Sequence, residues 1–320
     1  MSSLDIILED SELRQDVIKS LGRSDLPQQF GYDPSDIQKF LSDLQYGEEV
    51  PAGKSDYEAI ILLVGRPVLE IVHNTYTPPI SKVWHQKLSD NRKNIEKAIP
   101  SVGRIELREH PDYEWVGTGW LVRDDVVVTN RHVAEAFAHK QGDDFVFSLN
   151  PNGRTIGARI DFREEYRQPE QIEFRVKRVL HIEPRPGADV AFLKVATTSQ
   201  VDTPLTPAIP LASEIPNSET DVVVIGYPAW DGRRNDPENM KRIFRNIYKV
   251  KRLAPGKVSL NSSRNYVITH DCSTLGGNSG SVVLDIETGK AVGLHYAGRY
   301  KKTNYAVTAV KVAQLLEAVL

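Results

Sequence analysis

A serine in a glycine-rich turn is the first group in this chain that could do chemistry. The segment runs Asp271-Cys-Ser-Thr-Leu-Gly-Gly-Asn-Ser-Gly-Ser281. A serine hydroxyl becomes a useful nucleophile only when a base removes its proton, and attack on an amide carbonyl needs donors for the oxyanion that forms. Glycine lets the backbone N–H groups of Gly277 and Ser279 face one cavity. We therefore predict Ser279 as nucleophile and the N–H groups of Gly277 and Ser279 as an oxyanion hole; the alternative is a structural turn between two strands.

A histidine and an aspartate supply the groups that such a serine needs. His132 follows the β-branched run Val126-Val-Val-Thr129, so a strand can deliver its imidazole to a cleft. Asp189 precedes the apolar run Val190-Ala-Phe-Leu193, where a carboxylate is costly unless it is hydrogen-bonded. Alone, each residue is better explained as structural. In the order His, Asp, Ser they fit a base, a residue that orients the base, and a nucleophile.

The elements that must position these residues are mostly short strands. From about Ser101 onward, β-branched runs alternate with glycine, proline and other turn residues, which favours an all-β sandwich or barrel. The final segment, Ala309 to Leu320, has a helical apolar stripe. We expect a β-rich domain over residues 96–320, closed by this helix.

The first 95 residues have a different pattern. Apolar residues at helical spacing and capping residues predict helices over four ranges: Glu12–Leu21, Ile37–Leu44, Tyr57–Val64 and Ile80–Ile99. We predict a small helical domain over residues 1–95 that recruits or inhibits the rest of the chain, or docks it to a partner.

Composition excludes several classes of protein. The 320 residues carry a net charge of -3 and one cysteine, Cys272, so no intramolecular disulfide can form. A lone cysteine favours a reducing compartment, and no secretory signal or membrane span is visible, which predicts a soluble cytoplasmic protein. Histidine spacing gives no metal site, and no cofactor is expected.

Three motifs resemble those of a known family. Thr129-Asn-Arg-His-Val, Asp189-Val-Ala and Gly277-Asn-Ser-Gly-Ser are similar to bacterial trypsin-like (chymotrypsin-fold) serine peptidases, especially the glutamyl endopeptidases. The resemblance covers about two thirds of the chain and does not reach the helical N-terminal part. It implies a mainly β fold with two six-stranded antiparallel barrels, and endopeptidase activity on protein or peptide substrates through an acyl-enzyme. Helical regions fused to such bacterial peptidases suggest, by analogy, a stress or defence role with a regulatory protein partner.

The resemblance also implies a substrate pocket. Thr274 and His295 match positions that line the primary pocket of glutamyl endopeptidases, and a histidine beside a hydroxyl could bind a substrate carboxylate. This predicts cleavage after acidic residues; the alternative is that His295 only packs in a barrel. Asn278 departs from the aspartate that animal digestive zymogens carry before the nucleophile. Activation by a newly cut N-terminus is therefore not expected, and any control must use another device.

Two further hypotheses remain to be weighed. The chain could be a binding protein on a protease scaffold with little turnover, although a complete triad argues against it. A lipase or esterase of the α/β-hydrolase type would have the order Ser, Asp, His.

The basic run Lys241–Arg252 could bind nucleic acid or an acidic substrate. The slightly negative overall charge instead favours a solvated loop and strand, so a nucleic-acid partner is disfavoured.

Overall fold

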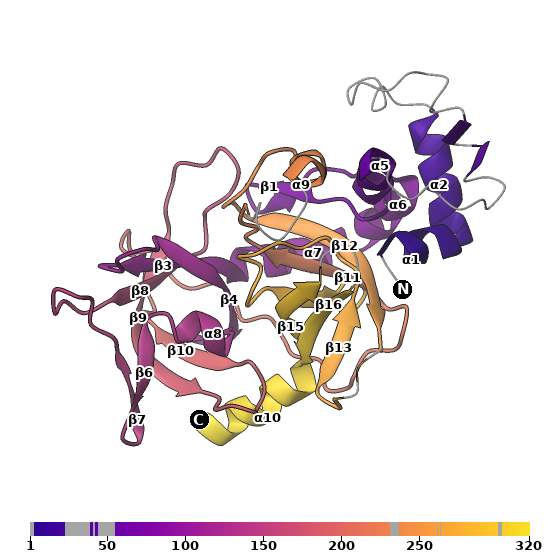
Figure 1. The fold of residues 1–320 in the computed structure, drawn as a ribbon. Coiled ribbons are helices and arrows are strands. Elements are labelled where there is room, and N and C mark those ends of the chain that lie inside the picture. The colour runs from indigo at the N-terminus through magenta and orange to yellow at the C-terminus, as the bar shows by residue number, and fades with distance from the viewer. Residues whose placement is uncertain are drawn as a thin grey trace.

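The fold is known from a computed structural model. It describes residues 3–22, 39–40, 42–43, 55–230, 237–260, 262, 264–299 and 303–320. Figure 1 shows two β-barrels side by side, with helices grouped at the far end of the second barrel. Element labels below are those of Figure 1.

The first barrel closes in the order β10-β5-β4-β3-β8-β9. All of its strand pairs are antiparallel. The strands are β3 (Val102–Arg108), β4 (Trp115–Arg123), β5 (Val126–Thr129), β8 (Gly157–Asp161), β9 (Glu173–Ile182) and β10 (Ala191–Val195). Leu121, Val127 and Leu193 are fully buried within it. A hairpin of β6 (Ala138–Gln141) and β7 (Asp144–Phe147) projects from this barrel (Figure 1).

The second barrel also has six strands in a closed ring, because β11 pairs with both β14 and β12. The strands are β11 (Asp221–Gly226), β12 (Arg252–Ser259), β13 (Val267–His270), β14 (Val282–Asp285), β15 (Ala291–Arg299) and β16 (Thr303–Thr308). One hydrophobic cluster joins Trp120 and Phe192 of the first barrel to Val223 and Leu294 of the second. The predicted fold of two six-stranded antiparallel barrels is thus confirmed.

The C-terminal helix α10 (Ala309–Val319) begins where the sequence predicts. The Thr308 side chain caps it by accepting a hydrogen bond from the N–H of Lys311 at 3.3 Å. Val312 and Leu316 are buried in the cluster shared by the barrels. The helix therefore covers the lower end of the second barrel (Figure 1).

The N-terminal region is helical, as expected. Among the described residues its helices are α1 (Ser3–Glu9), α2 (Ser11–Leu21), α5 (Ser55–Gly65), α6 (Lys82–Asp90) and α7 (Arg92–Ala98), followed by a short 3-10 turn (Ile99–Ser101). The single helix expected over Ile80–Ile99 is instead two, because Asn91 leaves the helical conformation and its side chain bonds the carbonyl of Lys87 at 2.9 Å. The helix expected over Ile37–Leu44 lies mostly outside the described residues.

This region also contributes strands and core to the second barrel. Strand β1 (Leu69–Val72) pairs with β12, and β2 (Thr75–Tyr76) pairs with β1. Leu62 and Trp84 of the helices pack in one cluster with Val224 and Val258 of the barrel. The division at residue 95 stays a prediction, and residues on its two sides share a core.

The basic run is only partly solvated. Helix α9 (Pro237–Phe244) buries Ile243 and Phe244. Lys251 and Arg252, however, are buried, although a solvated face was expected. Lys251 Nζ donates to the carbonyl of Phe162 at 2.8 Å, and Arg252 donates to the carbonyls of residues 68 and 69. These two cations therefore tie segments of the chain together.

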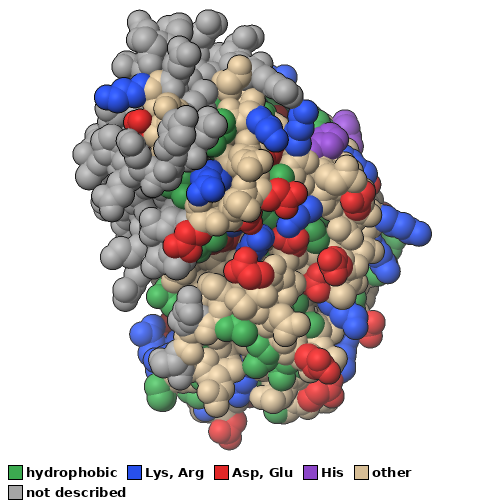
Figure 2. All heavy atoms as spheres, turned by 90° about the vertical axis from the view of Figure 1, so that its right-hand side faces the viewer, with side chains coloured by type: hydrophobic (Ala, Val, Ile, Leu, Met, Phe, Trp, Pro, Cys, Tyr) green, Lys and Arg blue, Asp and Glu red, His purple; other side chains and the backbone are tan. Residues whose placement is uncertain are grey.

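The surface shows no separation of charge by sign on the face turned toward the viewer in Figure 2, where Lys and Arg side chains mingle with Asp and Glu. No helix in the described part of the chain is long and apolar enough to cross a membrane. Within the same residues, no group of three or more His, Cys, Asp or Glu side chains could hold a metal ion.

Candidate active site

His132 lies in α8 (Arg131–Ala134), a single turn of helix directly after β5. Its Nδ1 is 2.7 Å from Oδ2 of Asp189, and its backbone N–H donates to Oδ1 of the same carboxylate at 3.1 Å. The imidazole side chain is 41% exposed, so it is open to solvent on one side. Two contacts to one carboxylate fix both the position and the ring orientation of His132.

Asp189 is held in turn by residues that flank the histidine. Asn130 Nδ2 donates to the Asp189 carbonyl at 2.9 Å. Arg131 Nη1 donates to the carbonyls of Gly187 and Ala188 at 3.2 and 3.1 Å. Burial alone would raise the pKa of Asp189, but the hydrogen bonds from His132 and the charge of Arg131 outweigh it, so the pKa lies below its ordinary value. Asp189 is therefore ionised at neutral pH.

Ser279 lies in a turn that only glycine could form on either side. Gly277 has φ +82° and Gly280 has φ +89°, both in the left-handed region. A Cβ on Gly280 would also approach Thr129 Oγ1 to 2.7 Å. The N–H of Thr118, on β4, donates to the Ser279 carbonyl at 2.8 Å. The turn from the second barrel therefore rests against the strand of the first barrel that neighbours β5 and His132.

Two peptide groups in this turn are oriented by hydrogen bonds to their carbonyls. The carbonyl of Gly276 accepts from the N–H of Ala229 at 2.6 Å, and the carbonyl of Asn278 accepts from the N–H of Ser281 at 2.9 Å. In a planar trans peptide the N–H points opposite to the carbonyl. The N–H groups of Gly277 and Ser279 therefore point away from the carbonyls of Gly276 and Asn278, each in a fixed direction.

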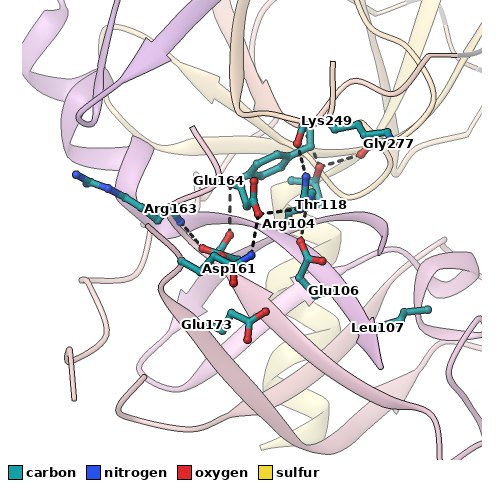
Figure 3. A network of polar contacts seen from close by, with 12 residues as sticks. Arg104, Glu106, Leu107, Thr118, Asp161, Arg163, Glu164, Glu173, Lys249 and Gly277 are labelled. Carbon is teal, nitrogen blue, oxygen red and sulfur yellow. Dashed lines mark hydrogen bonds and ion pairs between the residues drawn. The ribbon is translucent and has the colours of Figure 1, made fainter. Parts of the chain in front are cut away.

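Thr118 links the turn to a polar network between the barrels. Its hydroxyl donates to the Gly277 carbonyl at 2.9 Å and accepts from the N–H of Tyr227 at 3.2 Å. Figure 3 shows Thr118 and Gly277 beside Arg104, which lies over the ring of Trp115 at 5.4 Å. The Trp115 ring also lies against Gly277, where it would meet an added Cβ. Thr118 and Trp115 of this network thus hold the turn in place at Gly277.

Carboxylates dominate the rest of this network. Arg104 is paired with Glu106 and with Glu164, the latter at 2.9 Å, and it donates to the carbonyl of Lys249. Burial raises the pKa of Glu106 to about 7, an effect that Arg104 opposes and that Glu164 and Asp161 reinforce. Glu106 therefore titrates near neutral pH.

Thr274 and His295 have separate hydrogen-bond partners. Thr274 Oγ1 donates to Oδ1 of Asn304 at 2.6 Å. His295 is buried, and its Nδ1 lies 3.1 Å from Nε2 of a second buried histidine, His270. Asn304 on β16 pairs with His270 on the neighbouring strand β13. The partner of Thr274 and the partner of His295 are therefore adjacent. The structure therefore brings these residues to one end of the second barrel.

Burial sets the protonation of both histidines. It lowers the pKa of His270 to about 3. Burial also lowers the pKa of His295 well below its ordinary value, and His270 and His132 lower it further. Both imidazoles are therefore neutral at neutral pH, and across the 3.1 Å contact one ring donates its N–H to the other.

The sequence did not single out several residues that hold this site. Asn130 and Arg131 adjoin His132 in sequence and could have been suspected for that reason. Thr118, His270 and Arg104 gave no local signal, because the groups that they contact lie on segments distant in sequence.

The structure has two closed antiparallel barrels. A histidine follows a strand of the first barrel, and a Gly-x-Ser-Gly turn of the second barrel rests against the first. This is the architecture of chymotrypsin-fold serine peptidases. Residues 117–294 match the family described as trypsin-like peptidase domain. The chain belongs to this family and is a serine peptidase that acts on protein or peptide substrates.

Three individual proteins are similar to this chain. A probable serine protease of Lysobacter enzymogenes is 28% identical over 295 residues, which cover 82% of this chain and 74% of that protein. The solved structure of Deg5 has a TM-score of 0.50 at 19% identity, covers 73% of this chain and 96% of its own, and shares the fold. The active form of the Rv3671c protease from M. tuberculosis has a TM-score of 0.46 at 22% identity and covers 72% and 86% of the two chains.

Proposed function

We propose that the chain is an endopeptidase in which Ser279 is the nucleophile, His132 the general base and Asp189 the residue that orients it. The observation that carries this assignment is the paired contact of His132 with Asp189, through Nδ1 at 2.7 Å and through the backbone N–H at 3.1 Å. With its Nδ1 proton held by an ionised carboxylate, His132 presents an unprotonated Nε2 to a serine hydroxyl.

The reaction follows from these roles. Ser279 Oγ attacks the peptide carbonyl while His132 takes its proton, and the oxyanion of the tetrahedral intermediate accepts from the N–H groups of Gly277 and Ser279. His132 then gives the proton to the leaving amine, which leaves an acyl-enzyme. Water, activated by His132, attacks the acyl carbonyl and restores the free serine. The fixed orientation of both peptide groups supports the oxyanion role, because donors already in place need no reorganisation during the reaction.

The substrate preference that we propose is for an acidic residue before the cleaved bond. If His270 Nε2–H donates to His295 Nδ1, then Nε2 of His295 carries its proton and can donate to a substrate carboxylate. Thr274 lies near the same end of the barrel and adds a hydroxyl that can turn from Asn304 to the ligand. The neutral state of His295 supports a donor role and makes recognition independent of a charge on the protein.

The test is covalent labelling. A fluorophosphonate should modify Ser279 in the wild-type protein and should fail to modify Ser279→Ala, which should also lose peptide hydrolysis by several orders of magnitude. Undiminished cleavage by pure Ser279→Ala would overturn the assignment, and a folded wild-type protein that resists labelling would favour a binding protein on a protease scaffold.

We also propose a cytoplasmic location and a regulatory partner that acts through residues 1–95 in a bacterial stress or defence pathway. The single, buried cysteine supports a reducing compartment. The contacts of the N-terminal helices with the second barrel support a regulatory route, since a partner bound there would act on the barrel that carries Ser279. Cross-linking in cells, followed by comparison of the full chain with a chain that lacks residues 1–22, tests for such a partner.

A further inference from the structure

The N-terminal region makes a buried ion pair with the segment that leads to Ser279. Arg66 follows α5 directly, and its guanidinium is paired with the carboxylate of Asp271. The two side chains are 0% and 3% exposed. We call residues Asp271–Asn278 the pre-nucleophile segment. A buried charge is tolerated only with a partner, so Arg66 and Asp271 each depend on the other.

The same region contacts the pre-nucleophile segment a second time. Ser273 Oγ donates to the backbone carbonyl of Arg66 at 2.8 Å. On the opposite side, Asp271 Oδ1 accepts from the N–H of Lys257, on β12, at 2.7 Å. The start of the segment is therefore held between strand β12 of the barrel and Arg66, the residue that follows α5.

These contacts continue into the proposed substrate pocket. The carbonyl of Cys272 accepts from Asn304 Nδ2 at 2.7 Å, and Oδ1 of the same Asn304 accepts from Thr274 Oγ1 at 2.6 Å. Arg66 thus binds residues 271 and 273, whereas Asn304 binds residues 272 and 274. Both sets of contacts fix the backbone that carries Thr274.

Arg66 is itself fixed by the fold of the N-terminal region. The carbonyl of Gly65 accepts from Trp84 Nε1 at 2.7 Å and from Arg66 Nη1 at 2.6 Å. Trp84, on α6, is fully buried, and its ring lies 5.5 Å from the guanidinium. Burial would lower the pKa of Arg66, but the Asp271 carboxylate raises it above the ordinary value. The guanidinium is therefore charged, and its contacts with Gly65 and Trp84 hold it in position beside the pre-nucleophile segment.

We propose that Arg66 is a positioning residue for the substrate pocket, through which the N-terminal region holds the pre-nucleophile segment in its substrate-binding conformation. This proposal rests on the proposed function, because it assumes that the segment borders the pocket. Asn278 cannot form an ion pair with a newly cut N-terminus, so another group must order the segment before the nucleophile. In this chain that group is the cation Arg66, which pairs with Asp271. A partner that pulls the N-terminal region away from the barrel would then weaken substrate binding.

The experiment compares Arg66→Met with the control Lys87→Met. Lys87 also links the N-terminal region to the second barrel, through an ion pair with Asp221 at 2.7 Å, but Asp221 lies on β11 and outside the pre-nucleophile segment. Each full-length variant is assayed for KM and kcat on a peptide substrate, for the rate of fluorophosphonate labelling, and for amide hydrogen exchange in residues 271–278. All measurements are made at a temperature at which circular dichroism shows the variant to be folded.

Arg66→Met should lower kcat/KM about 10- to 100-fold, mainly through KM, because a misplaced binding wall costs that much. Hydrogen exchange in the pre-nucleophile segment should accelerate, whereas labelling of Ser279, which needs no pocket, should change by less than about threefold. The double variant Arg66→Met/Asp271→Asn should recover part of the loss, since no charge is then left buried alone. Lys87→Met should match the wild type in all three measurements.

Two results would overturn the proposal. One is a folded Arg66→Met with wild-type KM and wild-type exchange in residues 271–278. The other is an equal loss of hydrolysis and labelling that follows the folded fraction, which indicates a structural role alone. If Arg66→Met does not fold, the double variant Arg66→Met/Asp271→Asn, which leaves no buried charge unpaired, takes its place, and wild-type KM with wild-type exchange in residues 271–278 for that variant also overturns the proposal. Failure of the proposed function is distinct, because the wild-type protein itself would then resist the label.

Discussion

The hydroxyl of Thr118 donates to the carbonyl of Gly277 at 2.9 Å, and this contact joins a strand of the first barrel to the turn that carries Ser279. The same oxygen accepts from the N–H of Tyr227 at 3.2 Å. Thr118 is fully buried, so no water can replace these hydrogen bonds. The position of the turn that carries the proposed oxyanion donors therefore depends on a residue of the opposite barrel.

Replacement of Thr118 tests this dependence. Thr118→Val keeps the shape of the side chain but removes both hydrogen bonds, and it should lower kcat about tenfold or more because the turn loses its fixed orientation. Thr118→Ser retains the hydroxyl and should restore most of the activity. Steady-state kinetics on folded variants provide the measurement. Equal kcat for Thr118→Val and the wild type would show that the turn holds its shape without this contact.

Asp189→Asn tests the role of the orienting carboxylate. The variant should keep the fold, because an amide can still accept from the backbone N–H of His132. Hydrolysis should fall about 10³- to 10⁴-fold, since the amide stabilises the wrong tautomer of the imidazole. Asp124→Asn, on the exposed turn between β4 and β5, should behave like the wild type. A loss of less than about tenfold would argue against the proposed triad.

His295→Ala tests the proposed preference for acidic residues. Loss of one donor to a buried carboxylate should reduce kcat/KM for cleavage after Glu about 10- to 100-fold, with a much smaller effect on fluorophosphonate labelling. His139→Ala, an exposed histidine on the β6–β7 hairpin, is the matched control. A peptide library that shows preference for Leu, Phe or small residues, unchanged by His295→Ala, would mean that the histidine only packs in the barrel.

Glu106 should make the stability of the protein depend on pH near neutrality. Burial raises the pKa of Glu106 to about 7 from its ordinary value of 4.5, so the folded state binds this proton more tightly than the unfolded chain does. The stability that the protonated group contributes is fully present below pH 4.5 and is lost as pH rises through 7. A shift of this size corresponds to a change of about 3 kcal/mol in the free energy of unfolding.

Glu106→Gln should remove this dependence, because an amide does not titrate. Thermal melts from pH 4.5 to pH 8 provide the measurement, and the difference in melting temperature between the variant and the wild type should shift in favour of the variant as pH rises. Glu114→Gln, an exposed glutamate close by, should leave the dependence as it is in the wild type. Parallel curves for Glu106→Gln and the wild type would contradict the assignment of the titration to Glu106.

Local sequence patterns determined the character of most elements and the choice of candidate catalytic residues. β-branched runs specified strands, a helical apolar stripe specified the terminal helix, and the Gly-x-Ser-Gly turn singled out Ser279. These features are local because strand propensity, helix capping and the backbone freedom of glycine each depend on neighbouring residues. The order of His132, Asp189 and Ser279 then sufficed to suggest the class of enzyme.

Tertiary structure alone decided which distant residues hold the site. The burial of Lys251 and Arg252 and the pairing of β1 with β12 follow from packing between segments far apart in sequence. Arg66 and Asp271 are 205 residues apart in the chain, and no pattern of neighbours links them. Long-range ion pairs and strand registers are fixed by burial, because a charge or a peptide group removed from water must find its partner in whatever segment the fold brings beside it.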